Sequence, residues 1–290
     1  MTDATRFQFT NPSVPKAYEE YFVPRLFEPW AELLLNEVQL RPGESVLDVA
    51  TGPGTVARLA AQRVGSGGRI SAADIAEPML NIARSKPRPS NAAPIEYLLS
   101  PAAPLAAQGG TYDAVLCQQG LQFFPDRVAA LCEMRRVLKS SGRIAVAVWT
   151  EIERNEIFAA YHAALRATTP PQLADLILAP FSWPSGTELK AAAEEAGFRY
   201  IRSMTPSLPM VLEGGLDQAL RAFAATPVSP GVAALPQDVQ DAFFARVRRE
   251  LAPLTKGGEV IGQMTSNIIV GTCCSGSRGQ CLLMRARSRL

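Results

Sequence analysis

Residues 46–54 join an acidic side chain, at the end of an apolar run, to a turn that carries two glycines. Glycine has no side chain and tolerates unusual backbone angles, so such a turn lets the backbone approach a bound ligand. A helix-like stretch, 55–61, follows directly, and its free amide groups would point at the same ligand. Asp74 follows Gly54 by about 20 residues, the spacing at which nucleotide-binding folds place a ribose-binding carboxylate. These residues predict a site for a nucleotide-like ligand.

Two ligand classes fit this turn. Residues 52–57 match the loose dinucleotide pattern G-x-G-x-x-A, and Asp74 suits either class. Asp48 separates the two, because a carboxylate at the strand end would repel the pyrophosphate of NAD but would tolerate the sulfonium amino acid of S-adenosylmethionine. The residues therefore favour S-adenosylmethionine. NAD, and a strand-to-helix turn that holds no ligand, remain the alternatives.

The elements that must position this turn alternate between strand-like and helix-like segments. Strands are expected over residues 45–49, 69–73, 95–99, 112–117 and 143–149. Helices are expected over residues 55–64, 78–85 and 127–138. Such alternation indicates a parallel sheet that is covered on both faces, with ligands at the carboxyl ends of its strands.

The flanking segments extend this core. Residues 17–38 have a helical, aromatic-rich pattern that Pro24 and Pro29 are predicted to break into pieces. After Trp149, helices are expected over 152–167, 188–196, 216–224 and 237–252, with strands over 200–205 and 265–270. We divide the chain into an N-terminal arm and helical cap (1–42), a ligand-binding core (43–150), the rest of the sheet with helical substrate-cap insertions (151–272), and a poorly ordered basic tail (273–290).

The composition narrows the classes of function. The chain has 290 residues, 47% hydrophobic and 19% charged, which suffices for a sizeable core. A net charge of only +2 gives no electrostatic footprint for nucleic acid, so we expect no nucleic-acid partner. With no apolar run of about 18 residues and no leader pattern, we expect no membrane span and a cytoplasmic protein. His162 is the only histidine, and the five cysteines match no zinc spacing, so we expect no metal site.

Three segments together resemble a known family. They are residues 46–54, Asp74 with the Pro78-Met79-Leu80 run, and residues 112–126, and the segment 133–143 adds a similar helix and turn before the fifth strand. The combination resembles the class I S-adenosylmethionine-dependent methyltransferases, most closely the branch similar to the ubiquinone and menaquinone biosynthesis enzymes. The resemblance is clear over residues 43–150 and weaker beyond. It implies an α/β fold with a doubly wound, mostly parallel, seven-stranded Rossmann-like sheet under a helical cap.

The resemblance also implies roles for individual residues. Ala50, Gly52 and Gly54 would pass the methionine part of S-adenosylmethionine, and Asp48 would anchor the local network of amides. Asp74 would accept hydrogen bonds from both ribose hydroxyls. Other expected cofactor contacts come from the N-terminal helix and from the ends of the second, third and fourth strands: Tyr18, Ile75, Met79, Ser100, Pro101, Gln118 and Gln119.

Two positions depart from the family pattern. Ala50 replaces the first glycine of the stricter motif. Ser100, followed by Pro101, stands after the third strand where relatives carry an aspartate that reads the adenine amino group. A hydroxyl accepts a weaker hydrogen bond than a carboxylate does, so adenine recognition is expected to differ.

The acceptor side is less marked in the sequence. Methyl transfer needs a base only where the acceptor must lose a proton. His162, Glu156 and Tyr21 are the candidates for catalysis, while a half-buried histidine and a solvated acid at a helix start are the alternatives for the first two. The candidates for acceptor binding are Tyr21, Phe22, Phe124 and Tyr161.

We therefore expect methyl transfer from S-adenosylmethionine to a small, apolar or aromatic molecule. An NAD-linked oxidoreductase and a protein that binds S-adenosylmethionine without transferring methyl are the alternatives. The sequence leaves open the acceptor atom and the oligomeric state, with a homodimer as one possibility.

Overall fold

The computed structural model describes residues 17–273. The arm expected over residues 1–15 and almost all of the expected basic tail lie outside the described residues. Within them the chain forms a sheet whose main path has the order β3-β2-β1-β4-β5-β9-β6, with β7 and β8 paired to β9. The strands are β1 (Ser45–Val49), β2 (Arg69–Asp74), β3 (Ile95–Leu99), β4 (Tyr112–Gln118), β5 (Leu138–Trp149), β6 (Arg199–Met204), β7 (Ser207–Leu212), β8 (Thr255–Lys256) and β9 (Glu259–Thr272).

The seven strands of the main path are those predicted from the sequence, and the predicted doubly wound, mostly parallel sheet is confirmed. β1 pairs in parallel with β2 and β4, β2 with β3, and β4 with β5, whereas β9 runs antiparallel to both β5 and β6. The sheet order reverses between β1 and β4, so the carboxyl ends of these strands form the crevice where such folds bind ligands.

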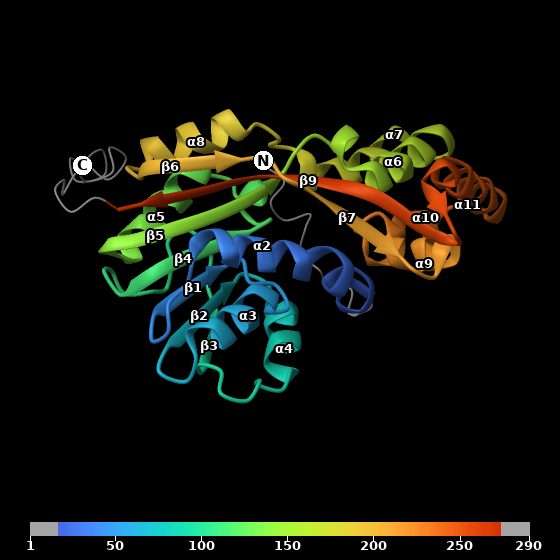
Figure 1. The fold of residues 1–290 in the computed structure, drawn as a ribbon. Coiled ribbons are helices and arrows are strands. Elements are labelled where there is room, and N and C mark those ends of the chain that lie inside the picture. The colour runs from blue at the N-terminus through green and yellow to red at the C-terminus, as the bar shows by residue number, and fades with distance from the viewer. Residues whose placement is uncertain (1–16, 274–290) are drawn as a thin grey trace.

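Helices cover the sheet on both faces (Figure 1). They are α2 (Glu28–Val38), α3 (Thr55–Val64), α4 (Glu77–Ser85), α5 (Arg127–Val137), α6 (Glu156–Thr168), α7 (Pro171–Ala174), α8 (Gly186–Glu195), α9 (Gly215–Ala222), α10 (Ser229–Ala233) and α11 (Gln237–Leu251). Neighbouring residues of β1 enter different cores: Val46 packs with α2 and α3, and Leu47 with α5 and α8. Burial on both faces is the reason why these strands are continuous apolar runs.

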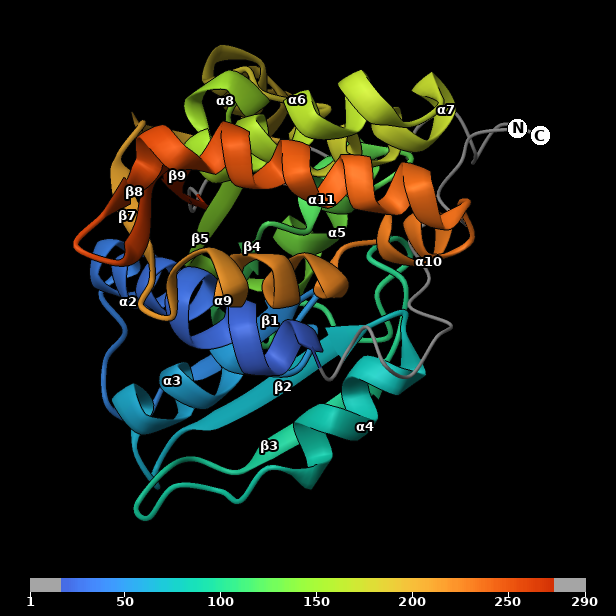
Figure 2. The same ribbon diagram turned by 90° about the vertical axis from the view of Figure 1, so that its right-hand side faces the viewer.

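A helical cap extends the sheet beyond its core. The first half of β9 pairs with β7 and β8 instead of β5, and α6, α9 and α11 gather around this extension (Figures 1 and 2). Short 3-10 turns lie between the helices and strands: η3 (Leu121–Phe123) in the core, and η4 (Ile152–Arg154), η5 (Asp175–Phe181), η6 (Phe223–Ala225) and η7 (Ala252–Leu254) after β5. The sequence did not predict β7, β8, α7 or α10. The helix expected over residues 152–167 divides at Asn155, whose side chain accepts a hydrogen bond from Thr265 N on β9 at 3.0 Å.

The prediction that Pro24 breaks the N-terminal helical segment is wrong. Pro24 does not break it, because the chain passes through this residue as a π-helix, η2 (Tyr18–Phe27). A π-helix bonds each N–H to the carbonyl five residues back, which changes the turn around a residue that has no N–H. Pro29 lies in the first turn of α2, where a missing N–H costs nothing.

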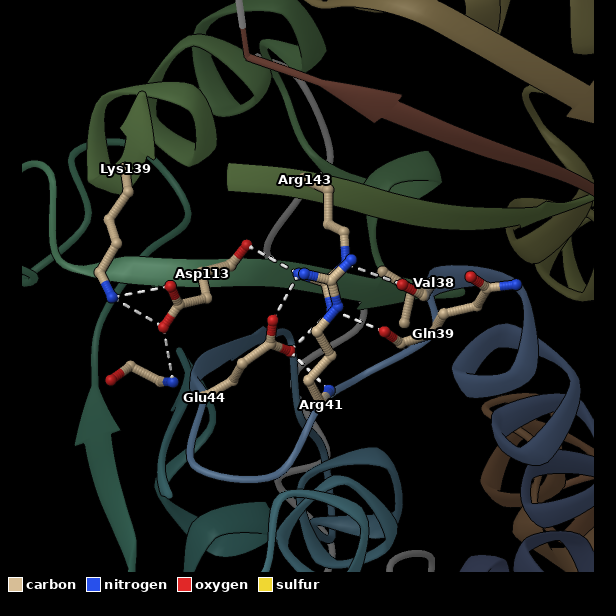
Figure 3. A network of polar contacts seen from close by, with 8 residues as sticks. Val38, Gln39, Arg41, Glu44, Asp113, Lys139 and Arg143 are labelled. Atoms are coloured by element: carbon tan, nitrogen blue, oxygen red, sulfur yellow. Dashed lines mark hydrogen bonds and ion pairs between the residues drawn. The ribbon is translucent and has the colours of Figure 1, made fainter. Parts of the chain in front are cut away.

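Arg143 on β5 binds the C-terminal end of α2 (Figure 3). This contact lies at the edge of the sheet opposite the crevice. The Arg143 guanidinium donates to the carbonyls of Val38 and Gln39 at 2.7 and 2.8 Å and to both carboxylate oxygens of Glu44 at 2.8 and 2.7 Å. The last carbonyls of a helix have no partner within the helix, so this arginine caps α2 and fixes its end.

None of the helices between residues 17 and 273 is both long and apolar enough to span a bilayer. The same residues contain no group of three or more histidine, cysteine, aspartate or glutamate side chains that could hold a metal ion.

Candidate active site

A cavity of about 430 Å³ opens at the carboxyl ends of β1, β2 and β4 and extends beneath the helical cap. Its floor includes Ala50, Gly52 and Asp74, and the cap contributes Phe22 from η2 and Phe181 from η5. Most of its lining is apolar. A cavity of this kind, at the point where the sheet order reverses, is the expected place for a bound nucleotide and a small molecule.

Asp74, at the end of β2, is fixed by two backbone donors. Its Oδ2 accepts from Gly52 N at 2.7 Å and its Oδ1 from Ala76 N at 2.8 Å. Burial raises the pKa of Asp74, and these donors act against the rise. Tyr18 lies close to Asp74. Burial, and after it the charge of Asp74, raise the pKa of the Tyr18 phenol well above its ordinary value. Both residues line the cavity.

The expected adenine contacts lie beside Asp74. Ile75 and Met79 both line the cavity, and Ile75 leaves 65% of its surface exposed although it is aliphatic. An exposed isoleucine at the mouth of a cavity offers an apolar surface on which a planar ring can pack.

Asp48 does not line the cavity but lies behind the glycine turn. Its Oδ2 accepts from Thr51 Oγ1 at 2.5 Å and from Ala57 N at 3.1 Å, so it ties the turn to the first turn of α3. Burial raises its pKa to about 7. Gly54 does not line the cavity either: its φ is +82°, and a Cβ there would lie 3.0 Å from the Cβ of Ala83. It serves the close packing of α3 against α4.

Two residues with side chains adopt left-handed backbone conformations at the floor of the cavity. Ala50 has φ +58° and Gln119 has φ +55°, at the ends of β1 and β4 respectively. Such angles cost about 1–2 kcal/mol for a residue other than glycine, and they gather at functional sites. Both residues line the cavity.

Three buried glutamines, one at the end of β4 and two just after it, line the cavity: Gln118, Gln119 and Gln122. Gln118 Nε2 donates to the carbonyl of Phe27 at 2.9 Å, and Gln119 Nε2 donates to Ser266 Oγ at 3.0 Å. The Oε1 atoms of Gln118 and Gln119 have no partner among residues 17–273. Unpartnered amide oxygens suit a ligand that presents ammonium or sulfonium charge. Sequence reasoning did not single out Gln122, because nothing in its pattern distinguishes it from its neighbours.

Hydrogen bonds within the loop after β3, and one to α5, fix its conformation. Ser100 Oγ accepts from Ala106 N at 2.9 Å and donates to the carbonyl of Pro101 at 2.8 Å. Glu133 on α5 accepts from Leu105 N at 2.8 Å. Ser100 and Pro101 line the cavity as expected, but the hydroxyl of Ser100 already bonds to its own loop.

The acceptor-side candidates separate into two groups. Phe22 and Phe124 line the cavity, whereas Tyr21 and Tyr161 do not. Tyr161 is buried behind the wall and stacks on Phe223 with ring centroids 3.7 Å apart. Phe123, which the sequence also placed beside the cofactor or the acceptor, lines the cavity too. Aromatic side chains that the sequence did not indicate complete the lining: Phe27, Trp149, Phe158 and Phe181. Several of these come from the cap, whose packing no local pattern reveals.

Two of the candidate catalytic residues lie away from the cavity. Glu156 Oε2 accepts from Gln263 N on β9 at 2.7 Å and so begins α6 against that strand. His162 lies half-buried on α6, and burial and then the charge of Arg166 lower its pKa. With Tyr21 also absent from the lining, the structure brings none of the three to the cavity.

The charge of the lining distinguishes between cofactors. Among the described residues that line the cavity, Asp74 and Asp126 are acidic, and none is lysine, arginine or histidine. A dinucleotide would place its pyrophosphate beside acids with no cation opposite. A cationic nucleoside fits this lining, and the unpartnered oxygens of Gln118 and Gln119 lie on the same floor.

Comparison with known sequences supports the same class. Residues 22–205 match the ubiE/COQ5 methyltransferase family. A nocamycin O-methyltransferase of Saccharothrix syringae is 31% identical over 196 residues, covering 63% of this chain and 69% of that protein. A ubiquinone/menaquinone biosynthesis C-methyltransferase of Hydrogenovibrio crunogenus is 28% identical over 198 residues, covering 66% and 72%.

Comparison with solved structures supports the fold. Phosphoethanolamine N-methyltransferase 2 of Haemonchus contortus aligns with a TM-score of 0.58 at 16% identity, over 93% of this chain and 59% of that longer chain. The YcgJ protein of Bacillus subtilis aligns with a TM-score of 0.56 at 18% identity, over 85% and 98%.

Proposed function

The chain belongs to the ubiE/COQ5 methyltransferase family and is a methyltransferase that depends on S-adenosylmethionine, and from this premise we propose that its acceptor is a small, apolar or aromatic molecule bound under the helical cap. The observation that carries this proposal is the lining of the cavity. Aromatic rings from both the sheet and the cap surround its inner part, among them Phe22, Phe124, Trp149, Phe158 and Phe181. Rings of this kind exclude water and favour planar, uncharged ligands.

The cofactor would lie along the ends of β1, β2 and β4. In this proposal Asp74 accepts hydrogen bonds from the ribose hydroxyls, and Ile75 and Met79 pack on the adenine. Ala50 and Gly52 pass the methionine part, and Tyr18 closes over it from η2. When bound, S-adenosylmethionine supplies an electrophilic methyl group on a positively charged sulfur.

Several residues would support this site without touching the cofactor. Asp48 and Gly54 lie behind the lining, where they shape the glycine turn and its packing on α4. The hydroxyl of Ser100 is engaged within its own loop, so we propose that backbone groups of residues 100–103 read the adenine edge.

The chain's own contribution to the reaction is alignment and exclusion of water. Holding two reactants in line removes most of the entropic barrier to a displacement. The ionisable side chains in the described lining are Asp74, Asp126 and Tyr18. Asp126 is the N-cap of α5, accepting from Ala129 N at 2.8 Å, and the raised pKa of Tyr18 keeps its phenol protonated at neutral pH, so that it is not available as a base. The site therefore suits an acceptor that reaches it as a competent nucleophile. The relatives named for O- and C-methylation leave both kinds of acceptor atom open.

The test has two stages. Calorimetric titration with S-adenosylhomocysteine, and with NAD and NADH in parallel, should show binding of S-adenosylhomocysteine alone. Release of S-adenosylhomocysteine is then measured with two acceptor panels, one of phenols and hydroquinones with one or two rings, the other of phosphoethanolamine and small aliphatic amines. Turnover confined to the apolar panel is expected. Turnover confined to the polar panel would overturn the proposed acceptor class and leave the cofactor assignment intact.

A further inference from the structure

Gln122 differs from the other two glutamines of the cavity in having both ends of its amide unpartnered. Its side chain is 3% exposed, and neither Nε2 nor Oε1 has a hydrogen-bond partner in the part of the chain that the structure describes. Gln118 and Gln119 each use their Nε2 in a bond to the protein. Buried amide groups are almost always paired, because an unmade hydrogen bond is costly, so a residue with two such groups calls for an explanation.

The backbone of Gln122 is held in place although its side chain is not. It lies in the 3-10 turn η3, and its carbonyl accepts from Arg127 Nη2 at 3.1 Å. Arg127 in turn lies over the ring of Trp183, 4.8 Å from its centroid. The backbone that carries the amide is thus fixed by the fold, and rearranging η3 would break contacts that are already made.

The surroundings of Gln122 within the cavity are apolar. η3 lies in contact with η5, from which Ile177, Pro180 and Phe181 line the cavity, and Phe123 and Phe124 follow Gln122 in the chain. These side chains offer no hydrogen bond to an amide. A polar group placed among apolar walls is the usual means by which a binding site fixes the orientation of an apolar ligand.

We infer that Gln122 is a specificity-determining residue that binds an acceptor carrying a hydrogen-bond donor and a hydrogen-bond acceptor side by side. This inference rests on the proposed function and narrows its substrate class. A primary amide presents one N–H donor and one carbonyl oxygen in a fixed arrangement, and a hydroxyl next to a carbonyl, or a carboxamide, presents the complement. A ring that lacks either group leaves half of the buried amide unpaired, and sites of this type reject such analogues.

The experiment uses two matched pairs of neutral bicyclic probes, titrated calorimetrically into protein saturated with S-adenosylhomocysteine. 3-Hydroxychromone and chromone differ by one hydroxyl, and 2-naphthamide and 2-acetylnaphthalene differ by an amide nitrogen in place of a methyl group. The wild-type protein should bind the donor-bearing member of at least one pair roughly tenfold more tightly, and the pair that shows the preference tells a hydroxy-carbonyl from a carboxamide.

Variants separate this role from a structural one. Gln122→Met keeps the unbranched shape and removes the hydrogen-bonding pair, so the preference should fall to about twofold or less while the Kd for S-adenosylhomocysteine stays within about twofold. Gln122→Leu, which also removes both hydrogen-bonding groups and cannot ionise, gives a second reading should the methionine variant fold poorly. Gln218→Met alters another buried glutamine, one that does not line the cavity, and should keep the wild-type preference.

The outcomes are distinct. Loss of the preference in both Gln122 variants, with retention in Gln218→Met, supports the inference. Equal binding within each pair by the wild-type protein, or a preference that survives both Gln122 variants, overturns it while the proposed function stands. Failure of all four probes to bind would overturn the apolar acceptor class, and the inference with it.

Discussion

A Cβ placed on Gly120 would lie 2.5 Å from the Cβ of Ala50. Ala50 follows the last residue of β1 and Gly120 precedes η3, and the two lie side by side in the lining of the cavity. Ala50 carries a side chain where the stricter form of the motif has glycine, and it accepts a left-handed backbone in doing so. Gly120 provides the space that this methyl group needs, and the two positions therefore form one packing unit.

Gly120→Ala should lower the free energy of unfolding by about 1–3 kcal/mol. The backbone of Gly120, with φ −104° and ψ −40°, is accessible to alanine, so the cost comes from the clash with Ala50 and, to a lesser degree, from Cys117 Sγ at 3.2 Å. Adding Ala50→Gly removes the opposing methyl group and relaxes the φ of +58°, so the double variant should regain most of that stability. Urea unfolding of the wild type, both single variants and the double variant measures the coupling.

Gly110→Ala is the control for this cycle. Gly110 has a left-handed backbone with φ +68°, but nothing lies within 4 Å of a Cβ there, so its cost is conformational alone. Ala50→Gly should not rescue it. Equal rescue of both glycine variants would show that the benefit of Ala50→Gly is unrelated to Gly120.

The strands β1, β2, β4 and β5 were predictable because each is a largely buried run followed by a turn. The strand over residues 207–212 was missed, since it pairs with the first half of β9, far away in the chain. Pro24 was misread as a break, because a proline weighs against an α-helix but does not reveal that a π-helix is available.

Asp48 should make stability depend on pH in the opposite sense to a salt-bridged acid. Burial raises its pKa from 3.8 to about 7, so the folded state holds a proton that the unfolded chain has released. The contribution of Asp48 to the free energy of unfolding is present in full below pH 3.8 and is lost as the pH rises from there to about 7. Above that pH the stability no longer changes through Asp48, and the total loss is at most about 4 kcal/mol. Asp48→Asn keeps an acceptor oxygen and has no such dependence. The difference in unfolding free energy between wild type and variant, measured from pH 4 to pH 8, should shift in favour of the variant as pH rises. A difference that does not change with pH would contradict the raised pKa.

Asp74→Asn should weaken binding of S-adenosylhomocysteine by roughly tenfold to a hundredfold. Hydrogen bonds to a charged acceptor contribute about 1.5–3 kcal/mol, and the variant replaces a carboxylate oxygen with an NH2 group that would also oppose the N–H of Gly52 or Ala76. Calorimetric titration measures the change. Asp126→Asn is the control, because Asp126 also lines the cavity but is exposed and caps α5. A Kd within threefold of wild type for Asp74→Asn would refute its assignment to the ribose.

The cavity lining at the strand ends was easier to predict than the lining from the cap, for a physical reason. Asp74 and Gln118 are the last residues of β2 and β4, so they have recognisable places in the sequence. Other lining residues, which we propose face the acceptor, come from η5 and η6 in the cap, where helices joined by long connections fold back over the sheet. Burial there depends on tertiary packing, and for that reason Tyr161 points away from the cavity while Phe158, three residues earlier on the same helix, lines it.

Glu133 on α5 should position the loop after β3, which we propose reads the adenine, without touching the ligand. It is 7% exposed, forms hydrogen bonds to Arg136 at 2.7 and 2.8 Å, and accepts from Leu105 N, while Arg136 donates to the carbonyls of Leu105 and Ala107 at 3.1 and 3.0 Å. Burial alone would raise the pKa of Glu133, but the bonds from Arg136 and Leu105 hold it below 4.5.

Glu133→Gln leaves Arg136 without its carboxylate and should cost about 1–3 kcal/mol of stability at pH 7. Because the folded-state pKa is depressed, the stabilisation is present above pH 4.5 and is lost as the pH falls through the folded-state pKa, so wild type and variant should converge in acid. In the variant, the loop after β3 loses the carboxylate that accepts from Leu105 N. The affinity for S-adenosylhomocysteine should therefore fall several-fold, a change that calorimetry at pH 7 would detect. Glu77→Gln removes an exposed pair with Arg84 and should change stability by less than about 0.5 kcal/mol. Loss of stability in Glu133→Gln with unchanged affinity would mean that the loop keeps its place without Glu133, and that the adenine site is held by β3 alone.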